Sequence, residues 1–296
     1  MLVHCPLDPA ARARAVALET TLLVHGVPKE SAPVLATELS AIVREEGAVP
    51  AVVGVHAGRP IVGMTDAQVR DLLEATSVPK ANTANLGACL FRESHAATTV
   101  ATTMELAAQA GVRLFATGAL GGVHRNFAQH LDISGDLQAL VRFPVAVVSA
   151  GVKGLLDVHA TREALETLGI PVVGFQTDRF PAFYVRDGGT SVDARFDDLD
   201  ELARFIAFEL NRTGRGLVIA NPIAEQDAIP EAQWSRWLAQ AVEAAGDTAT
   251  GRDATPAILG HLHRLSGGKT LAANIALVKS NAQLAARLAS RLSRIG

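Results

Sequence analysis

The stretch Val145-Ala-Val-Val-Ser-Ala-Gly-Val-Lys153 decides the fold class. It opens with a short aliphatic run, bends at Ser149-Ala-Gly151, and leads into a helix that we expect to begin near Lys153. A brief and almost wholly apolar strand is covered on both faces, which is typical of parallel sheets flanked by helices. Comparable short strands are predicted at residues 51–55, 61–62, 112–116, 172–176 and 217–220.

Helical patterns alternate with these strands along the chain. One begins at Thr65-Asp-Ala-Gln68, which has the form of a capping box and predicts a helix to residue 75. The others are predicted at residues 32–46, 98–110, 132–141, 231–245, 255–265 and 270–291. Strands separated by helices imply a largely parallel sheet with helices on both faces, and ligands beyond the carboxyl ends of its strands. We therefore predict an α/β fold with a single domain over residues 1–296.

The composition excludes several classes of function. The net charge is only −3 and aromatic residues make up 4% of the chain, so the basic surface and stacking platforms of nucleic-acid-binding proteins are not expected. No apolar run approaches the length of a membrane span, and Asp8, Arg12 and Arg14 interrupt any signal peptide. The two cysteines, Cys5 and Cys89, indicate free thiols. We expect a soluble cytoplasmic protein with no nucleic-acid or membrane partner.

Lys153 is a candidate nucleophile, because it follows an apolar strand where a lysine has little reason to exist for packing. Removal from water lowers the pKa of a lysine and makes its neutral amine available. Such an amine attacks a sugar aldehyde and forms a Schiff base. Taken alone, the residue is more simply a solvated lysine in the first turn of a helix, since most lysines are exposed.

Glu19 is a candidate proton donor. It is the one carboxylate in the apolar and hydroxyl-rich stretch from Val16 to Val24, which we interpret as a strand. Burial would raise its pKa and allow general acid catalysis near neutral pH. The alternative is an ordinary strand residue that points outward, although the apolar neighbours on both sides weaken it.

Two further segments suggest ligand contacts. Asp132 and Asp136 are four residues apart in the helix expected at 132–141, so both carboxylates would lie on one face and could hold a divalent ion largely through water. Helix capping by Asp132 beside a solvated Asp136 is the commoner situation. The glycine-rich loop from Gly118 to Arg125 offers backbone N–H groups and two cations to a phosphate, or is simply a turn.

Taken in order, segments spread over nearly the whole chain resemble one family. They are Ala17-Leu-Glu-Thr-Thr21, Gly47-Ala-Val-Pro-Ala51, Ala97-Thr-Thr-Val-Ala-Thr-Thr-Met104, Phe115-Ala-Thr-Gly-Ala-Leu-Gly-Gly-Val-His-Arg125, Asp132-Ile-Ser-Gly-Asp-Leu137, Val147-Val-Ser-Ala-Gly-Val-Lys153, Gly174-Phe-Gln-Thr177, Ala220-Asn-Pro-Ile223 and Asn274-Ile-Ala-Leu-Val278. The family is that of the pseudouridine-5′-phosphate glycosidases, also called indigoidine synthase A-like proteins. So many ordered segments are far more specific than one short motif.

The resemblance implies a role for each matched position. Lys153 would form an imine with the opened ribose, and Glu19 would donate the proton that opens the ring. Asp132 would bind one manganese ion per subunit, and Asp136 would lie close to the metal without binding it directly. The matched positions that would line the substrate site are Lys80, Val100, His124, Ser134 and Asn281. The resemblance also implies a three-layer α/β/α sandwich with a mostly parallel mixed sheet, and a homotrimer.

The implied reaction is the reversible cleavage of the C–C glycosidic bond of pseudouridine 5′-phosphate to uracil and ribose 5-phosphate. That bond has no heteroatom leaving group, so an imine at Lys153 is a physically sensible electron sink.

One departure from the family keeps two alternatives open. The segment Ala81-Asn-Thr-Ala-Asn-Leu86 carries no charge after Lys80, where the family usually has a basic stretch, and Asn85 stands at the position of an aspartate. A C-glycosynthase that joins ribose 5-phosphate to another aromatic ring is the first alternative. A catalytically retired sensor that binds a sugar phosphate is the second, although the joint presence of Glu19, Lys80, Asp132 and Lys153 argues against it.

Overall fold

The computed structural model describes residues 3–125, 127–245 and 254–295. Its centre is a ten-stranded sheet, in which the strands follow the order β11-β8-β12-β7-β6-β1-β2-β5-β4, with β3 paired to β2. The strands are β1 (Ala15–Glu19), β2 (Val49–His56), β3 (Arg59–Val62), β4 (Lys80–Ala81), β5 (Ala96–Thr98), β6 (Leu114–Ala116), β7 (Ala146–Ser149), β8 (Val172–Phe175), β11 (Ala194–Phe196) and β12 (Leu217–Ala220). A separate hairpin consists of β9 (Arg179–Ala182) and β10 (Val185–Ser191).

The sheet is mixed but mostly parallel, as the family resemblance implied. Its central strands all pair in parallel, and β2 pairs antiparallel with β3 and β5. Every residue of β1, β6, β7 and β12 is buried, which explains why these segments read as short apolar runs in the sequence.

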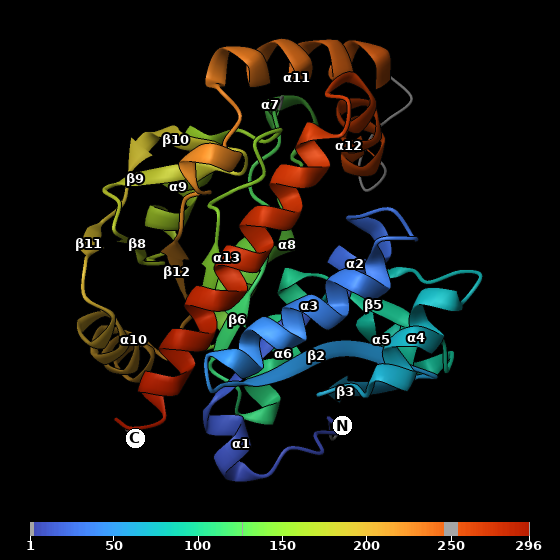
Figure 1. Ribbon diagram of the computed structural model, residues 1–296, viewed down its shortest axis with the longest axis vertical. Coiled ribbons are helices and arrows are strands. Elements are labelled where there is room, and N and C mark those ends of the chain that lie inside the picture. The colour runs from blue at the N-terminus through green and yellow to red at the C-terminus, as the bar shows by residue number, and fades with distance from the viewer. Residues whose placement is uncertain (1–2, 126, 246–253, 296) are drawn as a thin grey trace.

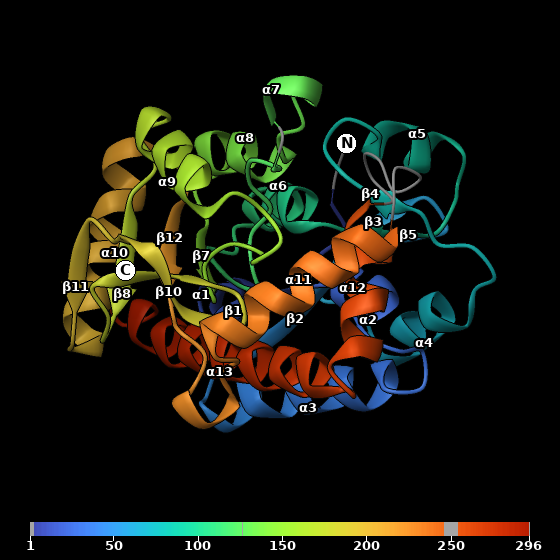
Figure 2. The same cartoon turned by 90° about the horizontal axis from the view of Figure 1, so that it is seen from above.

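Helices cover both faces of this sheet. The helices of the described chain are α1 (Pro9–Ala13), α2 (Thr21–His25), α3 (Ala32–Glu45), α4 (Asp66–Glu74), α5 (Leu86–Phe91), α6 (Val100–Ala110), α7 (Phe127–His130), α8 (Gly135–Arg142), α9 (Val158–Thr167), α10 (Leu199–Thr213), α11 (Glu231–Ala245), α12 (Ala254–Leu265) and α13 (Lys269–Leu292), with a 3₁₀ turn at Glu225–Asp227. Figure 2 shows α3 and α13 on one side of the strands and α6, α8 and α9 on the other. The predicted three-layer α/β/α sandwich is therefore confirmed.

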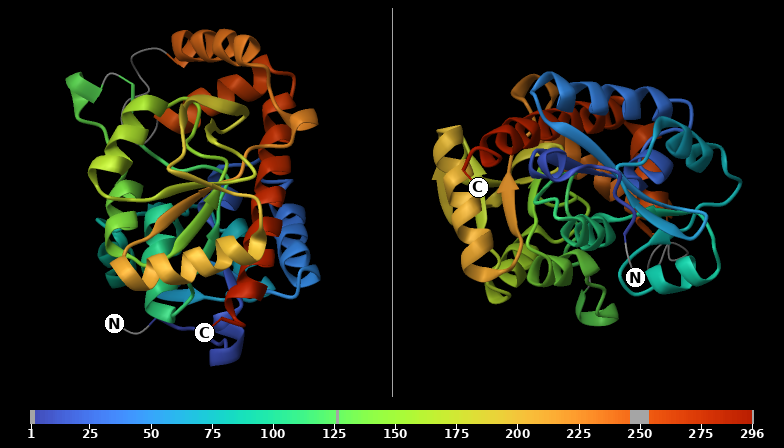
Figure 3. Two further views of the ribbon diagram at one scale, coloured as in Figure 1. Left: turned by 90° about the vertical axis from the view of Figure 1, so that its left-hand side faces the viewer. Right: turned by 90° about the horizontal axis from the view of Figure 1, so that it is seen from below.

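Figure 1 shows α11 and α12 at one end of the molecule, above the tip of α13. The two views of Figure 3 show α13 running along the body beside α3. None of the described helices is long and apolar enough to cross a lipid bilayer.

Local sequence signals explain several boundaries. The capping box at Thr65 is present, because its hydroxyl accepts a hydrogen bond from the Gln68 backbone and the Gln68 side chain accepts one from the Thr65 backbone. Helix α6 ends at Gly111, whose φ of 78° is the left-handed conformation that favours glycine.

Four predicted boundaries were wrong, and three of them lie at the carboxyl ends of strands. The strand expected to continue to Val24 ends at Glu19, and helix α2 follows it. Helix α8 starts at Gly135, because Ser134 is its N-cap and accepts a hydrogen bond from the Asp136 backbone, so Asp132 lies in the preceding loop. Lys153 also lies in a loop, since helix α9 starts only at Val158. Similarly, Thr98 ends β5 and α6 begins two residues later.

The turn after β7 requires glycine at position 151. Gly151 has a φ of 69°, and a Cβ atom there would lie 1.8 Å from the carbonyl oxygen of Pro181. This close approach lets the Phe183 backbone N–H bond to Ala150, and the Lys153 N–H bond to the carbonyl of Leu120 at 3.0 Å. The turn therefore fixes the backbone of Lys153 against the loop that follows β6.

Candidate active site

The functional candidates gather beyond the carboxyl ends of neighbouring strands, where open α/β sheets bind their ligands. Glu19 is the last residue of β1, and Lys153 follows the end of β7. Strand β6 lies between these two strands and leads into the loop that begins at Thr117. The order of the sheet thus brings together residues that are far apart in the sequence.

A cavity of about 360 Å³, which we call the main cavity, opens at this edge. Eight of the nine predicted site residues line it: Glu19, Lys80, Val100, His124, Asp132, Ser134, Asp136 and Lys153. A second hollow, the inner chamber, shares Glu19, Thr21, Lys80 and Lys153 with it. These four side chains therefore stand at the boundary between two connected spaces.

Glu19 has the environment of a proton-transfer group. Its side chain is only 9% exposed, and burial raises the pKa of its carboxyl from 4.5 to about 7. The charge of Asp136 raises this pKa as well, whereas the hydroxyl of Thr117, which donates to Oε1, and the charges of Lys153 and Lys80 lower it. A carboxyl with such a pKa can both give and take a proton near neutral pH.

Asp136 is also buried, but it is held differently. One carboxylate oxygen accepts the backbone N–H of Ala101 at 3.0 Å, and the other accepts that of Gly121 at 2.8 Å. Gly121 has no room for a side chain, because a Cβ atom there would lie 2.2 Å from the hydroxyl of Ser134. Asp136 therefore links the first turn of α6 to the glycine-rich loop, so that its carboxylate has a structural role.

Two helix N-termini face the main cavity. Val100 and Ala101 open α6, and Ser134 and Gly135 open α8. Helix N-termini carry partial positive charge and unpaired backbone N–H groups, so they attract anions such as phosphate. Lys80 lies in the same cavity and adds a full positive charge.

Asp132 is the only predicted metal ligand that the solvent reaches easily. Its side chain is 37% exposed, and its Oδ2 lies 3.5 Å from Nδ1 of His124. Within the described ranges, no three histidine, cysteine, aspartate or glutamate side chains form a cluster that could hold a metal. The site therefore fits only an ion that keeps most of its water ligands, which hard divalent cations do.

A sequence model of the indigoidine synthase A-like proteins matches residues 9–291. The chain belongs to this family.

Curated relatives in the family cover nearly the same length. A protein from Nocardioides sp. named pseudouridine-5′-phosphate glycosidase is 45% identical over 280 residues, which are 94% of this chain and 91% of the relative. One from Geobacillus kaustophilus with the same name is 44% identical over 281 residues, which are 94% of this chain and 93% of the relative.

Two crystal structures share the fold closely. The indigoidine synthase A-like protein from Thermotoga maritima is 32% identical, with a TM-score of 0.91 over 99% of this chain and 97% of its own. The prealnumycin C-glycosynthase AlnA, solved in complex with ribulose 5-phosphate, is 34% identical, with a TM-score of 0.91 over 100% of this chain and 98% of its own.

In this member of the family, Asn281 occupies a different place from the other predicted residues. It is fully buried on α13, and its amide donates to the carbonyl oxygens of Thr117 at 2.8 Å and Gly118 at 3.3 Å. Its Oδ1 accepts the amide of Asn221 at 2.9 Å. The structure thus places Asn281 behind the loop that carries the Thr117 hydroxyl, where it supports that loop.

The sequence analysis singled out Gly118 and Ala119 as part of a glycine-rich loop, but it missed the other residues that complete the inner chamber. Besides the four shared side chains, the chamber is lined by Leu22, His25, Gly26, Thr117, Gly118, Ala119, Phe183 and Asn274. A signal existed for Thr117, because it follows a buried strand of the predicted parallel sheet. No local signal existed for Asn274, which reaches the chamber from α13 and bonds to the carbonyl of Gly26, 248 positions away.

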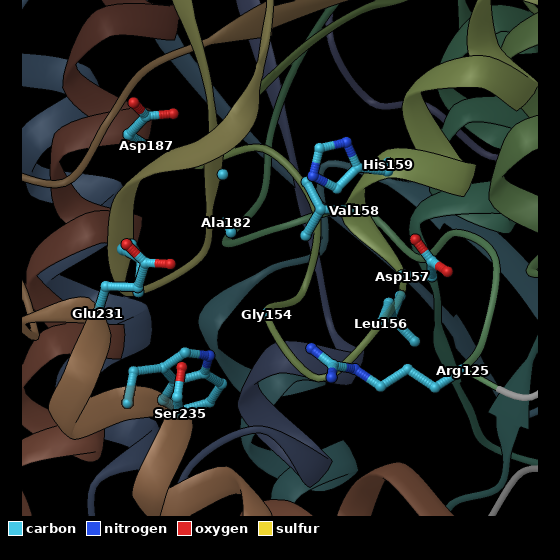
Figure 4. A pocket seen from close by; sticks show the side chains of 13 residues that line it. Arg125, Gly154, Leu156, Asp157, Val158, His159, Ala182, Asp187, Glu231 and Ser235 are labelled. Atoms are coloured by element: carbon cyan, nitrogen blue, oxygen red, sulfur yellow. The ribbon is translucent and has the colours of Figure 1, made fainter.

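A third hollow, the side cavity, lies next to the segment after Lys153 and shares Leu156 with the main cavity (Figure 4). Arg125 and His159 line it together with three carboxylates, those of Asp157, Asp187 and Glu231. The Asp157 carboxylate caps α9 by accepting the backbone N–H of Ala160. Glu19 and Lys153 line the other two spaces and not this one.

Proposed function

We propose that this protein is a C-glycosidase that cleaves, and in reverse forms, the bond between uracil and the ribose of pseudouridine 5′-phosphate. The observation that carries the proposal is the meeting of Glu19, whose pKa is raised to about 7, with Lys153 at the boundary of two connected spaces. The names of the curated relatives support this substrate.

The two spaces suit the two halves of the substrate. The main cavity holds the sugar phosphate, because two helix N-termini and Lys80 provide the positive potential that a phosphate needs. The inner chamber holds the base, because it contains apolar side chains and buried polar groups beyond the catalytic pair. The bond to be broken then lies between them, beside Glu19 and Lys153.

The chemistry runs in three steps. Protonated Glu19 donates to the ring oxygen of the ribose, the C1′–O bond breaks, and the amine of Lys153 bonds to C1′ and returns a proton to the Glu19 carboxylate. Glu19 then gives this proton to the ring carbon of uracil while the bond from that carbon to C1′ breaks, and the nitrogen lone pair of Lys153 forms the imine. Water finally hydrolyses the imine and releases ribose 5-phosphate and the free lysine.

Several features of the family remain proposals for this chain. One Mn²⁺ per subunit would be held by Asp132 and water, and would stabilise developing negative charge. Asp136, in contrast, already has two backbone partners. We also infer a homotrimer, which light scattering would test, and the cytoplasmic location stays a prediction.

A second candidate function is C-glycosynthesis with a different aromatic ring. It is favoured by the uncharged segment after Lys80, where Asn82 and Asn85 bond to the local backbone, and by the likeness to the C-glycosynthase AlnA. Product analysis separates the two, since the glycosidase releases uracil from pseudouridine 5′-phosphate and the synthase does not.

The decisive experiment combines mass spectrometry with a uracil-release assay in Mn²⁺. Incubation with ribose 5-phosphate and borohydride should add one reduced sugar phosphate to Lys153. The Lys153→Ala variant should lose the adduct, whereas Lys279→Ala, which removes a lysine that pairs with Glu38, should keep it. An adduct without uracil release would favour the synthase, and no adduct in the wild type would favour the retired sensor.

A further inference from the structure

The inner chamber contains two buried hydrogen-bond acceptors that have no partner within the described part of the chain. One is Oδ1 of Asn274, a residue that is only 5% exposed and whose amide nitrogen already donates to the Gly26 carbonyl at 3.2 Å. The other is Nδ1 of His25. Because buried polar atoms are nearly always paired in folded proteins, two unpaired acceptors on residues that line one chamber suggest that a bound molecule pairs with them.

The hydrogen bond of the other ring nitrogen fixes the tautomer of His25. Nε2 lies 2.9 Å from the carbonyl oxygen of Val78, and a carbonyl can only accept, so Nε2 carries the hydrogen. The neutral ring then presents a lone pair at Nδ1. Burial, followed by the nearby charge of Lys80, lowers the pKa of His25 and keeps the ring neutral at physiological pH.

Two acceptors fit a ligand with two donors. A uracil ring attached through carbon keeps both of its ring N–H groups, whereas the same ring attached through N1 keeps one. A base of the first kind has one donor for each acceptor, whereas one of the second kind would leave a buried acceptor unpaired at a free-energy cost. The chamber therefore has the pattern that would distinguish a C-linked from an N-linked pyrimidine.

We propose that His25 is a specificity-determining residue whose Nδ1 accepts a ring N–H of the base in the inner chamber. The proposal rests on the proposed function, since it takes the base to occupy this chamber. It predicts that pseudouridine 5′-phosphate is accepted and that methylation of the ring nitrogen facing His25 is penalised.

The test compares His25→Phe, which keeps the ring volume but loses both the acceptor and the bond to Val78, with His25→Gln, which restores an acceptor and a donor. For pseudouridine 5′-phosphate, kcat/KM should fall about 10- to 100-fold in His25→Phe and recover in part in His25→Gln. Substrates methylated at N1 or at N3 complete the design. Methylation at the nitrogen that faces His25 should cost the wild type more than it costs His25→Phe, because the variant has no acceptor to leave unpaired.

A base-independent control separates this role from the proposed function. The borohydride adduct of ribose 5-phosphate on Lys153 involves no base, so His25→Phe should form it at the wild-type level. If the wild type forms no adduct, the proposed function itself fails. A normal adduct with unchanged kcat/KM in His25→Phe overturns only the role of His25. If His25→Phe does not fold, the wild type alone decides. Equal turnover of pseudouridine 5′-phosphate and of both methylated substrates by the wild type would then overturn the role of His25.

Discussion

Two buried carboxylates, those of Asp136 and Glu19, line the same cavity but differ in their hydrogen bonds. Asp136 receives two backbone N–H groups, one from the first turn of α6 and one from the glycine-rich loop. Within the described chain, Glu19 receives one side-chain hydrogen bond, from Thr117, and burial raises its pKa to about 7. The difference shows that burial alone does not make a proton donor. A carboxylate fixed by two amides supports the site, and one left with a single hydroxyl can exchange its proton.

The sharpest test of this comparison is to replace Glu19 with a side chain that cannot exchange a proton. Glu19→Gln keeps the shape of the side chain but cannot transfer a proton, so we expect kcat to fall about 10²- to 10⁴-fold. Steady-state uracil release measures the effect, and Glu38→Gln on the surface of α3 is the control. A loss of less than threefold would show that Glu19 is not the general acid.

Asp136→Asn tests the other side of the comparison. The amide keeps one acceptor but turns a donor toward a backbone N–H, so we expect kcat/KM to fall about 10- to 100-fold through local distortion. Because the charge of Asp136 raises the pKa of Glu19, its removal should also move the pH profile of kcat/KM toward lower pH. A profile that keeps its position would mean that the two carboxylates act independently.

Thr117→Val removes the hydrogen bond that lowers the pKa of Glu19. The pKa should then rise further, and the pH profile should move toward higher pH, opposite to the shift in Asp136→Asn. We expect a loss in kcat of about tenfold near neutral pH, as for one lost hydrogen bond to a charged group. Thr117→Ser, which keeps the hydroxyl, should restore the wild-type profile.

The last test measures stability rather than turnover. The pKa of Glu19 is about 7 in the folded protein against 4.5 ordinarily, so between these pH values the folded state holds a proton that the unfolded state has released. The free energy of unfolding therefore falls as pH rises through this window, by at most about 3 kcal/mol. Glu19→Gln lacks this loss and should be more stable than the wild type at pH 8. Urea unfolding of both proteins at pH 5 and pH 8 would test it, and equal stabilities at pH 8 would contradict it.

Much of the fold was predictable because it depends on local patterns. Buried strands such as β7 and β12 are short apolar runs, and the capping box at Thr65 marks a helix start. The boundaries that failed lie where strands end at the site. There, Glu19 and Lys153 are placed by long-range contacts, so periodicity carries no information about them.

The candidate site was predictable where one residue type stood out against its surroundings, as Glu19 and Lys153 do. The spacing of Asp132 and Asp136 misled, because Ser134 caps α8 and leaves Asp132 in a loop. The inner chamber was not predictable. It joins His25, Thr117 and Asn274 from three distant segments, and only the folded chain brings them together.

Helix α13 has a consequence for the order in which the site is completed. Asn281 holds the turn at Thr117 and Gly118, and Asn274 on the same helix bonds to the carbonyl of Gly26. Both supports come from a helix that is synthesised after Glu19 and Lys153. A growing chain on the ribosome thus contains both candidate residues before α13 can support the loops beside them.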